Sequence, residues 1–437
     1  MYGCQCPKRL WLHKNKPGQR DEPDEAQSAI FQQGTDVGLL ARQLFPGRVD
    51  ASPADPYSYQ QSVADTARYL EEGHTVIYEA AFQYEGVLCA VDILVRKDGK
   101  WYAYEVKSTT GVKDPHKMDA ALQYYVITRS GLALADISIL HLNNQYIRNG
   151  ELDLNQLFTP SSALEVALEF QEYVEKKIKE LKAVIGNRQE PLIAMGPHCD
   201  NPYPCDFQGY CTGDEAEEEP DYGDTYINHE EIRAFTGSLT YPLYFMDFET
   251  WSTAVPEYNG HWQYRQVCFQ YSVHVQHGSN TDPKQHHYLA EGPHSPAEEF
   301  IENLLRVLGT EGSILVYNKT FEQTRLRELQ REFPRHAEAI DAILGRISDL
   351  MAPFRSHYRL PEMKGSYSIK AVLPALVPEL SYADLPIGNG ADASTAFYKL
   401  KDETDPVKVE ATRKALLEYC GLDTLAMVRL LEKLVLV

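Results

Sequence analysis

An acidic run near the middle of the chain restricts what this sequence can fold into. Residues 214–224 read DEAEEEPDYGD, with almost no apolar side chain to bury. Such a segment cannot offset the conformational entropy lost on packing, so it is typical of a linker. The chain has 437 residues, more than one hydrophobic core usually serves. We therefore expect a linker at 214–239 between two domains, at 1–213 and 240–437.

Composition and charge exclude several classes of protein. Asp and Glu outnumber Lys and Arg by 63 to 42, a net charge of −21, which argues against a basic coat for nucleic acid or membrane surfaces. No apolar run reaches the roughly 18–20 residues that span a bilayer, and the first residues lack the apolar stretch of a signal peptide. Eight cysteines are too few for a secreted disulfide scaffold. We expect a cytoplasmic protein with no membrane partner.

Hydrophobic patterning predicts an α/β fold for both halves. In the first half, strands separated by turn residues predict a meander at 76–84, 87–95 and 101–107. A helix at 116–129, a strand at 137–142 and a long helix at 164–185 complete a mixed α/β domain. The second half combines both kinds of element, with strands at 243–249, 267–275, 286–289 and 313–317 and helices at 321–333, 368–376 and 407–434.

Three charged residues are expected to meet on the meander. Asp92 lies in its second strand, and Glu105 and Lys107 lie in its third. Residues i and i+2 of a strand point to one face, and a hairpin partner can bring Asp92 beside them. Two converging carboxylates can hold Mg²⁺ or Mn²⁺, while the ammonium can position a water or stabilise a reacting phosphate. The alternative is a solvated ion pair between strands.

This pattern resembles that of a nuclease family. Asp92, followed after twelve residues by Glu105-Val106-Lys107, is similar to the motif of the PD-(D/E)XK nucleases, specifically their RecB-like branch, which includes the CRISPR-associated exonucleases. The resemblance covers roughly 4–211 and implies a restriction-endonuclease-like mixed sheet. It implies that Asp92, Glu105 and Val106 bind the metal and that Lys107 takes part in catalysis.

Two further positions belong to this resemblance. Gln123, followed by Tyr124 in the next helix, looks like the family's glutamine motif, which contacts the substrate or orders the site. The alternative for Gln123 is an ordinary surface position. In the segment GTDVG at 34–38 the surroundings match the family, but Gly38 stands where a metal-binding histidine is expected.

A run of three cysteines indicates a metal centre. Cys199, Cys205 and Cys211 form C-x5-C-x5-C in a loop rich in proline and glycine, where no regular element needs them as core. With Cys6 as a fourth ligand, the set resembles the RecB-like nucleases in which four cysteines hold a 4Fe–4S cluster that joins the ends of the domain. Structural Zn²⁺ is the competing interpretation, although these spacings differ from the usual C-x2-C.

The remaining cysteines are expected to bind no metal. Cys4 is a less favoured alternative to Cys6, because the sequence CPKRLWL that starts at Cys6 matches the family. Cys89, Cys268 and Cys420 lie in apolar strand or helix contexts, so we expect buried, inert thiols there.

Acidic residues also recur in the second half. Asp247 and Glu249 alternate in an apolar strand, and burying two carboxylates side by side is costly unless a cation offsets their repulsion. Glu322 lies where a strand runs into a helix and can face the same cleft. Tyr419 and Asp423 are four residues apart on an expected helix, so they share a face. Each motif alone is common in proteins, but the motifs in this order on these elements indicate one shared site.

In this order the motifs resemble those of the DnaQ-like DEDD exonucleases, in the subgroup that uses a tyrosine. The match runs from about 241 to 434 and implies an RNase H-like fold. It implies that Asp247, Glu249, Glu322 and Asp423 bind two metal ions and that Tyr419 orients the attacking water. Glu322 replaces the more usual aspartate.

Together, the halves resemble an uncharacterised family in which a RecB-like nuclease domain precedes a DnaQ-like domain of unknown function. We expect a metal-dependent nuclease that acts on DNA, on single strands or ends, with the second domain cutting from the 3′ end. Cations such as Lys8, Arg9, Lys14 and Lys16 can meet phosphate locally. Two alternatives stay open: a DNA-binding adapter whose first domain is catalytically silent, and an enzyme that acts on RNA.

Overall fold

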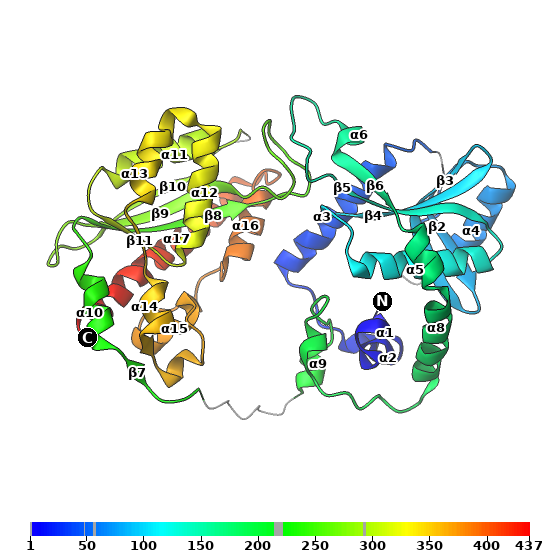
Figure 1. The fold of residues 1–437 in the computed structure, drawn as a ribbon, viewed down its shortest axis with the longest axis horizontal. Helices are drawn as coiled ribbons and strands as arrows, with labels where there is room; N and C mark the ends of the chain where they lie inside the picture. The colour runs from blue at the N-terminus through cyan, green and yellow to red at the C-terminus, as the bar shows by residue number, and fades with distance from the viewer. Residues whose placement is uncertain (1, 48, 56–57, 214–221, 292–293) are drawn as a thin grey trace. The chain divides into compact units, whose positions relative to one another are not determined.

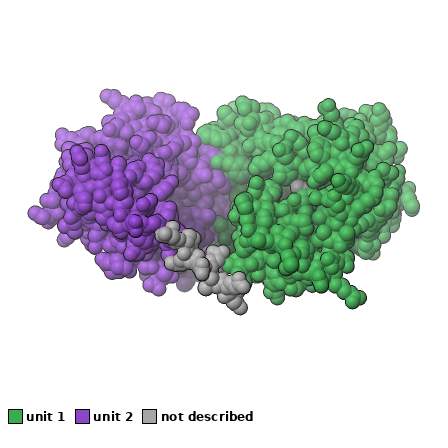
Figure 2. Space-filling view, turned by 60° about the horizontal axis from the view of Figure 1, so that its bottom comes forward, with its two compact units in different colours: residues 1–216, 253–264 green, residues 217–252, 265–437 purple. Residues whose placement is uncertain are grey.

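Two separate β-sheets organise the chain, one in each half (Figure 1). This computed structural model describes residues 2–47, 49–55, 58–213, 222–291 and 294–437. The chain divides into a first unit of residues 1–216 and 253–264 and a second unit of residues 217–252 and 265–437 (Figure 2). Both units are α/β, as the patterning predicts.

In the part of the chain that the structure describes, the first unit has a mixed sheet of six strands. They lie in the order β1 to β6, at Val49–Asp50, Val76–Tyr84, Val87–Lys97, Lys100–Lys107, Leu134–Leu142 and Phe158–Ser162. β2, β3 and β4 form the expected antiparallel meander. Its turns carry Glu85-Gly86 and Asp98-Gly99 at positive φ, as tight hairpins require. β5 pairs with β4 in parallel, which makes the sheet mixed.

Helices pack on both faces of this sheet. α4 (Tyr59–Glu71), α5 (Asp114–Arg129), α7 (Leu164–Glu169) and α8 (Gln171–Gly186) share a core with Ile139 on one face. α3 (Glu25–Arg42) packs on the other face, on the side of Leu140, because successive strand residues point to opposite faces. The remaining helices are α1 (Tyr2–Gln5), α2 (Pro7–Asn15), α6 (Leu154–Leu157) and α9 (Gln208–Thr212).

The long helix expected at 164–185 is two helices. α7 ends and α8 begins at Phe170, whose backbone leaves the helical conformation. The ring of Phe170 packs against the buried core, so the break lets both helices follow the sheet surface. Apolar spacing cannot distinguish one continuous helix from two that share a face.

Among the described residues, the second unit has a sheet of five strands. Their order is β10 (Lys284–Leu289), β9 (Val267–Gln276), β8 (Leu243–Trp251), β11 (Ser313–Val316) and β12 (Ile347–Asp349). β8, β9 and β10 are antiparallel, whereas β11 is parallel to β8 and β12 to β11. The four expected strands are therefore confirmed. β12 was not expected, because three residues carry no periodic signal.

α17 (Pro406–Val435) lies against β8 and β9, as the red helix in Figure 1. It shares a core with Phe245, together with α10 (His229–Gly237), α14 (Met351–Ser356) and α15 (Ile369–Leu376). α16 (Gly390–Lys399) contacts both α17 and β8. On the opposite face, Phe300 of α11 (Ala297–Leu308) contacts Phe248, and α12 (Lys319–Glu332) and α13 (Ala337–Leu344) pack against α11.

The second unit begins earlier than the expected linker end at residue 239. β7 (Tyr226–Ile227) pairs with β13 (Tyr358–Arg359), and α10 follows. The Asn228 side chain accepts a hydrogen bond from the Glu231 backbone and starts α10, while Ile232 is fully buried. Residues 226–239 are therefore folded structure, and the acidic residues 214–221 lie outside the described part of the chain.

No helix in the described ranges is both long enough and apolar enough to cross a membrane.

Gly312 sets the close approach between the chain before β8 and the chain before β11. Its φ is +85°, and a methyl group there would lie 2.0 Å from the carbonyl oxygen of Pro242.

Gly312→Ala is expected to lower the free energy of unfolding by about 2–5 kcal/mol, from backbone strain plus overpacking. Calorimetric melting measures this. Gly73→Ala is the control, since Gly73 has a φ of +81° but nothing within 4 Å of the added methyl group. Equal losses in both variants would show that the contact with Pro242 is unimportant.

Candidate functional site

The fold gathers the acidic residues of the second unit under α17. Asp247 and Glu249 follow Phe245 at alternate positions of β8, so all three point to the face that α17 covers. α17 brings Tyr419 and Asp423 to the same place, and both are buried. The charge of Asp423 acts on Asp247 and on Glu249, which places the three carboxylates in one cluster.

Glu322 reaches this cluster from the start of α12. Asn318, at a φ of 75°, turns the chain from the end of β11 into the helix, and Glu322 lies in the first turn. Only 2% of Glu322 is exposed, and no described group forms a hydrogen bond with its Oε2 atom. Its charge acts on both Asp247 and Glu249. The nearby Asp349 caps the following segment, because its Oδ1 accepts from the Met351 backbone at 3.1 Å.

Burial has the largest effect on the electrostatics of this cluster, and repulsion between its carboxylates adds to that effect at Asp247 and Glu249. Burial, and then the charge of Asp423, raise the pKa of Glu249 to about 8. Burial raises the pKa of Glu322 to about 8 and, with the neighbouring carboxylates, raises the pKa of Asp247 well above its usual value. The pKa of Asp423 is raised to about 6, again by burial. The cluster therefore cannot hold all its charges at neutral pH without a cation, and carboxylate oxygens are ligands for Mg²⁺ or Mn²⁺.

Three residues that the motifs did not indicate also belong to the cluster. Tyr382 donates a hydrogen bond to Asp423 Oδ1 at 2.6 Å. Lys370 Nζ lies 5.6 Å from the ring centre of Tyr382 and 5.7 Å from that of Tyr419, and its charge lowers the pKa of Asp423 and Glu249. Lys370 is otherwise exposed. Tyr382 and Lys370 come from the chain between the motifs, where no spacing rule could identify them.

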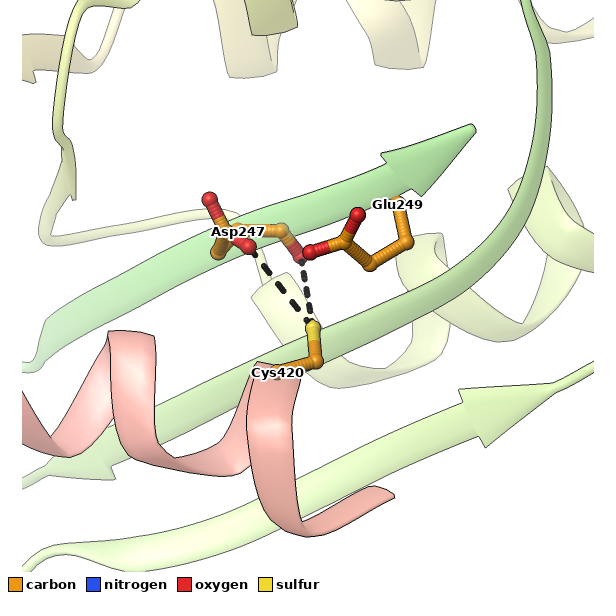
Figure 3. A group of neighbouring side chains, drawn as sticks. All are labelled: Asp247, Glu249 and Cys420. Carbon is orange, nitrogen blue, oxygen red and sulfur yellow. Dashed lines mark hydrogen bonds between the residues drawn. The ribbon is translucent and has the colours of Figure 1, made fainter. Parts of the chain in front are cut away.

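Cys420 is the third of these residues. It is fully buried, as expected, but its Sγ lies 3.7 Å from Asp247 Oδ2 (Figure 3). One ligand atom from each of Asp247, Glu249 and Cys420 lies within 4.8 Å of the others. The sequence indicated burial through the apolar helix context, but it could not indicate which strand the thiol faces.

In the first unit, the meander brings its predicted residues together. Asp92 Oδ2 accepts a hydrogen bond from the Val106 backbone at 2.6 Å. Lys107 Nζ donates to Glu105 Oε1 at 2.7 Å, and Gln123 Nε2 of α5 donates to Glu105 Oε2 at 2.8 Å. Gln123 is only 4% exposed, so it is not an ordinary surface residue.

This first cluster contains its own cation. Burial, and then the charge of Asp92, raise the pKa of Glu105 to about 8, and burial with the charge of Glu79 raises the pKa of Asp92 to about 6. Burial opposes the charge of Lys107, but Glu105 and Asp119 raise its pKa and keep it protonated. Lys107 also donates to Asp119 Oδ2 at 3.0 Å. One partly buried ammonium thus offsets part of the negative charge.

A cavity of about 290 Å³ opens beside Asp92 and Val106. α3 lines it with Gly34, Thr35, Gly38, Leu39 and Arg42, and β2 lines it with Glu79. Arg42 forms ion pairs with Glu79 at 2.9 Å and with Asp50 at 2.7 Å. Apart from its chain neighbours and the backbone of its own helix, no described atom lies within 4 Å of the position that a Cβ would take at Gly38. The glycine that replaces the expected histidine therefore faces open space next to Asp92.

The four predicted cysteine ligands line one cavity. Cys6, Cys199, Cys205 and Cys211 all border it, although Cys6 comes from the other end of the unit. The N-terminal helices are held there because Gln5 Nε2 donates to the His198 carbonyl oxygen at 2.8 Å and Arg9 pairs with Asp206 at 2.8 Å. Cys4 is exposed and lies outside the lining. Four thiols around one cavity fit either a 4Fe–4S cluster or a zinc ion.

Comparison with known proteins relates the second unit to a domain family. The family model described as "Domain of unknown function (DUF2779)" matches residues 244–368. This segment contains Asp247, Glu249 and Glu322, whereas Tyr419 and Asp423 lie beyond it. The chain is also 27% identical over 175 residues to "Uncharacterized protein UU173" of Ureaplasma parvum serovar 3, a match that covers 36% of this chain and 25% of that protein. The match thus spans about a quarter of that relative's length. The domain family that the second unit resembles has a description that states no function.

Proposed function

We propose that this protein is a metal-dependent nuclease that hydrolyses phosphodiester bonds of DNA. The observation that carries the proposal is the convergence of four carboxylates, from three separated segments, on one cluster beside Tyr419. Glu249, Glu322 and Asp423 are buried, and Asp247 is partly buried. A fold buries four repelling carboxylates at a cost of several kcal/mol unless cations bind them. The order of these residues resembles that of the DnaQ-like DEDD exonucleases, which extends the proposal to an RNase H-like fold.

Each residue of the cluster has a proposed role. The carboxylates would hold two Mg²⁺ or Mn²⁺ ions. These ions would activate a water molecule and stabilise the leaving oxygen. Tyr419 orients the attacking water, and Tyr382 fixes the carboxylate of Asp423 by its hydrogen bond. Lys370 is exposed at the edge of the cluster, where its ammonium can pair with a phosphate of the substrate. By the same resemblance, this site removes nucleotides from the 3′ end of single-stranded DNA or of duplex ends.

The first unit is proposed as a second nuclease site of the RecB-like PD-(D/E)XK type. Asp92, Glu105 and the backbone of Val106 would hold the metal, Lys107 would face the phosphate, and Gln123 orders Glu105. The resemblance implies the opposite polarity or endonucleolytic nicks. A second candidate follows from the open space at Gly38: without the histidine, this unit grips DNA for the other site and does not cut.

The cysteine cavity is proposed to hold a 4Fe–4S cluster. The donor chemistry fits, since Cys6 and the segment with Cys199, Cys205 and Cys211 line the same cavity. Ligation of all four would link the two ends of the unit. A bound cluster would supply cross-linking of the two ends of the unit, with no part in cutting. Free thiols and such a cluster suit a reducing compartment, so we place the protein in the cytoplasm.

Isosteric substitution of one carboxylate in each unit tests the two nuclease sites. Asp247→Asn is expected to slow the shortening of 5′-labelled single-stranded DNA from its 3′ end by about 100-fold or more, because a metal ligand is lost. Asp92→Asn is expected to remove a separate activity seen with 3′-labelled DNA. Product ladders in Mg²⁺ and in Mn²⁺ report both.

The controls for this assay separate the alternatives. Asp341→Asn on α13 is the control, because Asp341 is exposed and outside the cluster, and it should cut like wild type. An unchanged product ladder for Asp92→Asn would identify the first unit as a DNA-binding domain that does not cut. Faster cutting of RNA than of DNA of the same sequence would identify an enzyme that acts on RNA. Undiminished cutting by the Asp247→Asn, Asp92→Asn double variant would contradict both sites.

The raised pKa values predict how stability depends on pH without added metal. A carboxyl whose pKa rises from about 4.5 to about 8 on folding, as for Glu322, binds more protons in the folded state, so stability falls as pH rises between those values. Each unit of pKa shift corresponds to about 1.4 kcal/mol. The melting temperature of chelator-treated protein should therefore fall from about pH 6.5 to about pH 8. The melting temperature of the Glu322→Gln variant should fall less over this range. Added Mn²⁺ should make the melting temperature of the wild type less dependent on pH. A metal-free melting temperature that rises over this range would refute the charge repulsion.

Metal analysis of anaerobically purified protein tests the cysteine centre. Iron and sulfide in the 4Fe–4S ratio, with broad visible absorption, are expected in the wild type. Cys205→Ser should lose both and lower the melting temperature, because the two ends of the first unit come apart. Cys4→Ser is the control and should keep both, since Cys4 lies outside the cavity lining. Stoichiometric zinc without iron would assign the competing metal.

A further inference from the structure

The thiol of Cys420 lies within the carboxylate cluster of the second unit. Its Sγ lies 3.7 Å from Asp247 Oδ2 and 3.9 Å from the Asp247 carbonyl oxygen (Figure 3). α17 directs this thiol toward β8, from the position next to Tyr419. A thiol is a weak hydrogen-bond donor, so contacts of this length contribute little by themselves.

The separation between these atoms suits two ligands of one metal ion. A tetrahedral ion with bonds of about 2.3 Å to sulfur and about 2.1 Å to oxygen holds the two ligand atoms about 3.6 Å apart. The observed distance from Sγ to Oδ2 is 3.7 Å, and Glu249 offers a third ligand atom within 4.8 Å of both. Little movement would be needed to bring the three atoms into one coordination shell.

Glu322 gives a second and independent indication of a missing cation. Its side chain is 2% exposed, and no group among the described residues forms a hydrogen bond with Oε2. A buried, unsatisfied carboxylate oxygen is rare in folded proteins and usually indicates an ion or water that binds there. Its charge acts on Asp247 and Glu249, which are the two carboxylates grouped with the thiol.

We propose that Cys420 is a metal ligand, so that Asp247, Glu249 and Cys420 form a mixed oxygen and sulfur site for a divalent cation of the Zn²⁺ or Co²⁺ class. Thiolate ligands favour these softer ions, whereas an all-carboxylate site favours Mg²⁺. Binding forms one metal–sulfur bond and releases the thiol proton to solvent. The inference rests on the proposed function only in treating the cluster as a metal site. It replaces Mg²⁺ or Mn²⁺ by a softer ion at the position that Asp247, Glu249 and Cys420 share.

Absorption spectroscopy of the full chain loaded with Co²⁺ tests this ligand without relying on cutting. A cobalt–thiolate bond gives charge-transfer absorption, and the contribution of the four cysteines of the first unit is common to all variants and cancels on subtraction. Cys420→Ser should lose part of the wild-type absorption and bind Co²⁺ about tenfold or more weakly. Cys268→Ser is the matched control, because Cys268 is buried in the same unit but is not part of this group. It should match wild type.

Further variants show whether a loss of absorption in Cys420→Ser comes from the missing metal–sulfur bond. Asp247→Asn keeps the thiol but should also lose the same absorption, since the carboxylate and the thiol hold one ion. Cys420→Ala checks the serine variant, and unchanged melting temperatures confirm that both fold. A Cys420→Ser spectrum identical to wild type would overturn the proposal and leave Cys420 as a packing residue.

Cutting assays on the same samples separate this inference from the proposed function. Absorption that depends on Cys420, in a protein that cuts no nucleic acid, would support the mixed site and refute the nuclease. Cutting in Mg²⁺ or Mn²⁺ with no such absorption would support the nuclease and refute the cysteine ligand.

Discussion

The repulsion among buried carboxylates is the constraint on which the second unit depends. The alternation of β8 aims Asp247 and Glu249 at the face that α17 covers, and α17 buries Asp423 against them. A helix that docks there must either neutralise these groups or bind a cation, because moving charges from water into the protein costs several kcal/mol each. Lys370 is the cation whose charge reaches Asp423 and Glu249, and it is exposed, where water screens it. A cation bound at the proposed site would therefore favour the docking of α17.

The first unit meets the same constraint in a different way. Lys107 donates to Glu105 and to Asp119, so a partly buried ammonium is part of the cluster, and Arg42 offsets Glu79 at the cavity. These internal cations reduce the repulsion before any metal binds, so this unit depends less on an external ion. The sheet folds around Asp92 with open space left at Gly38, because these internal cations already offset part of the negative charge.

Sequence patterns predicted the parts of the structure that local rules determine. Apolar stretches separated by turn residues predicted the strands of the meander, an apolar stretch predicted β8, and i, i+4 spacing predicted that Tyr419 and Asp423 share one helix face. Residues that depend on tertiary packing were missed. Tyr382 and Lys370 lie between motifs, Glu79 and Arg42 meet only when α3 packs on the sheet, and Cys420 looked like ordinary core. The folded segment at 226–239 was assigned to the linker because its neighbours are acidic, although Ile232 and Phe235 pack into the core.

The two clusters also differ in how far apart their residues lie along the chain. Asp92 and Glu105 come from one hairpin, so the first cluster forms wherever β3 and β4 pair. Asp247, Glu322 and Asp423 come from β8, α12 and α17, and their proximity exists only when the whole unit is folded. A cation that binds all three adds its binding free energy to the folded state alone, since the unfolded chain holds no such site. An ion at the proposed site would therefore stabilise the packing of the last helix, in addition to the chemistry proposed for it.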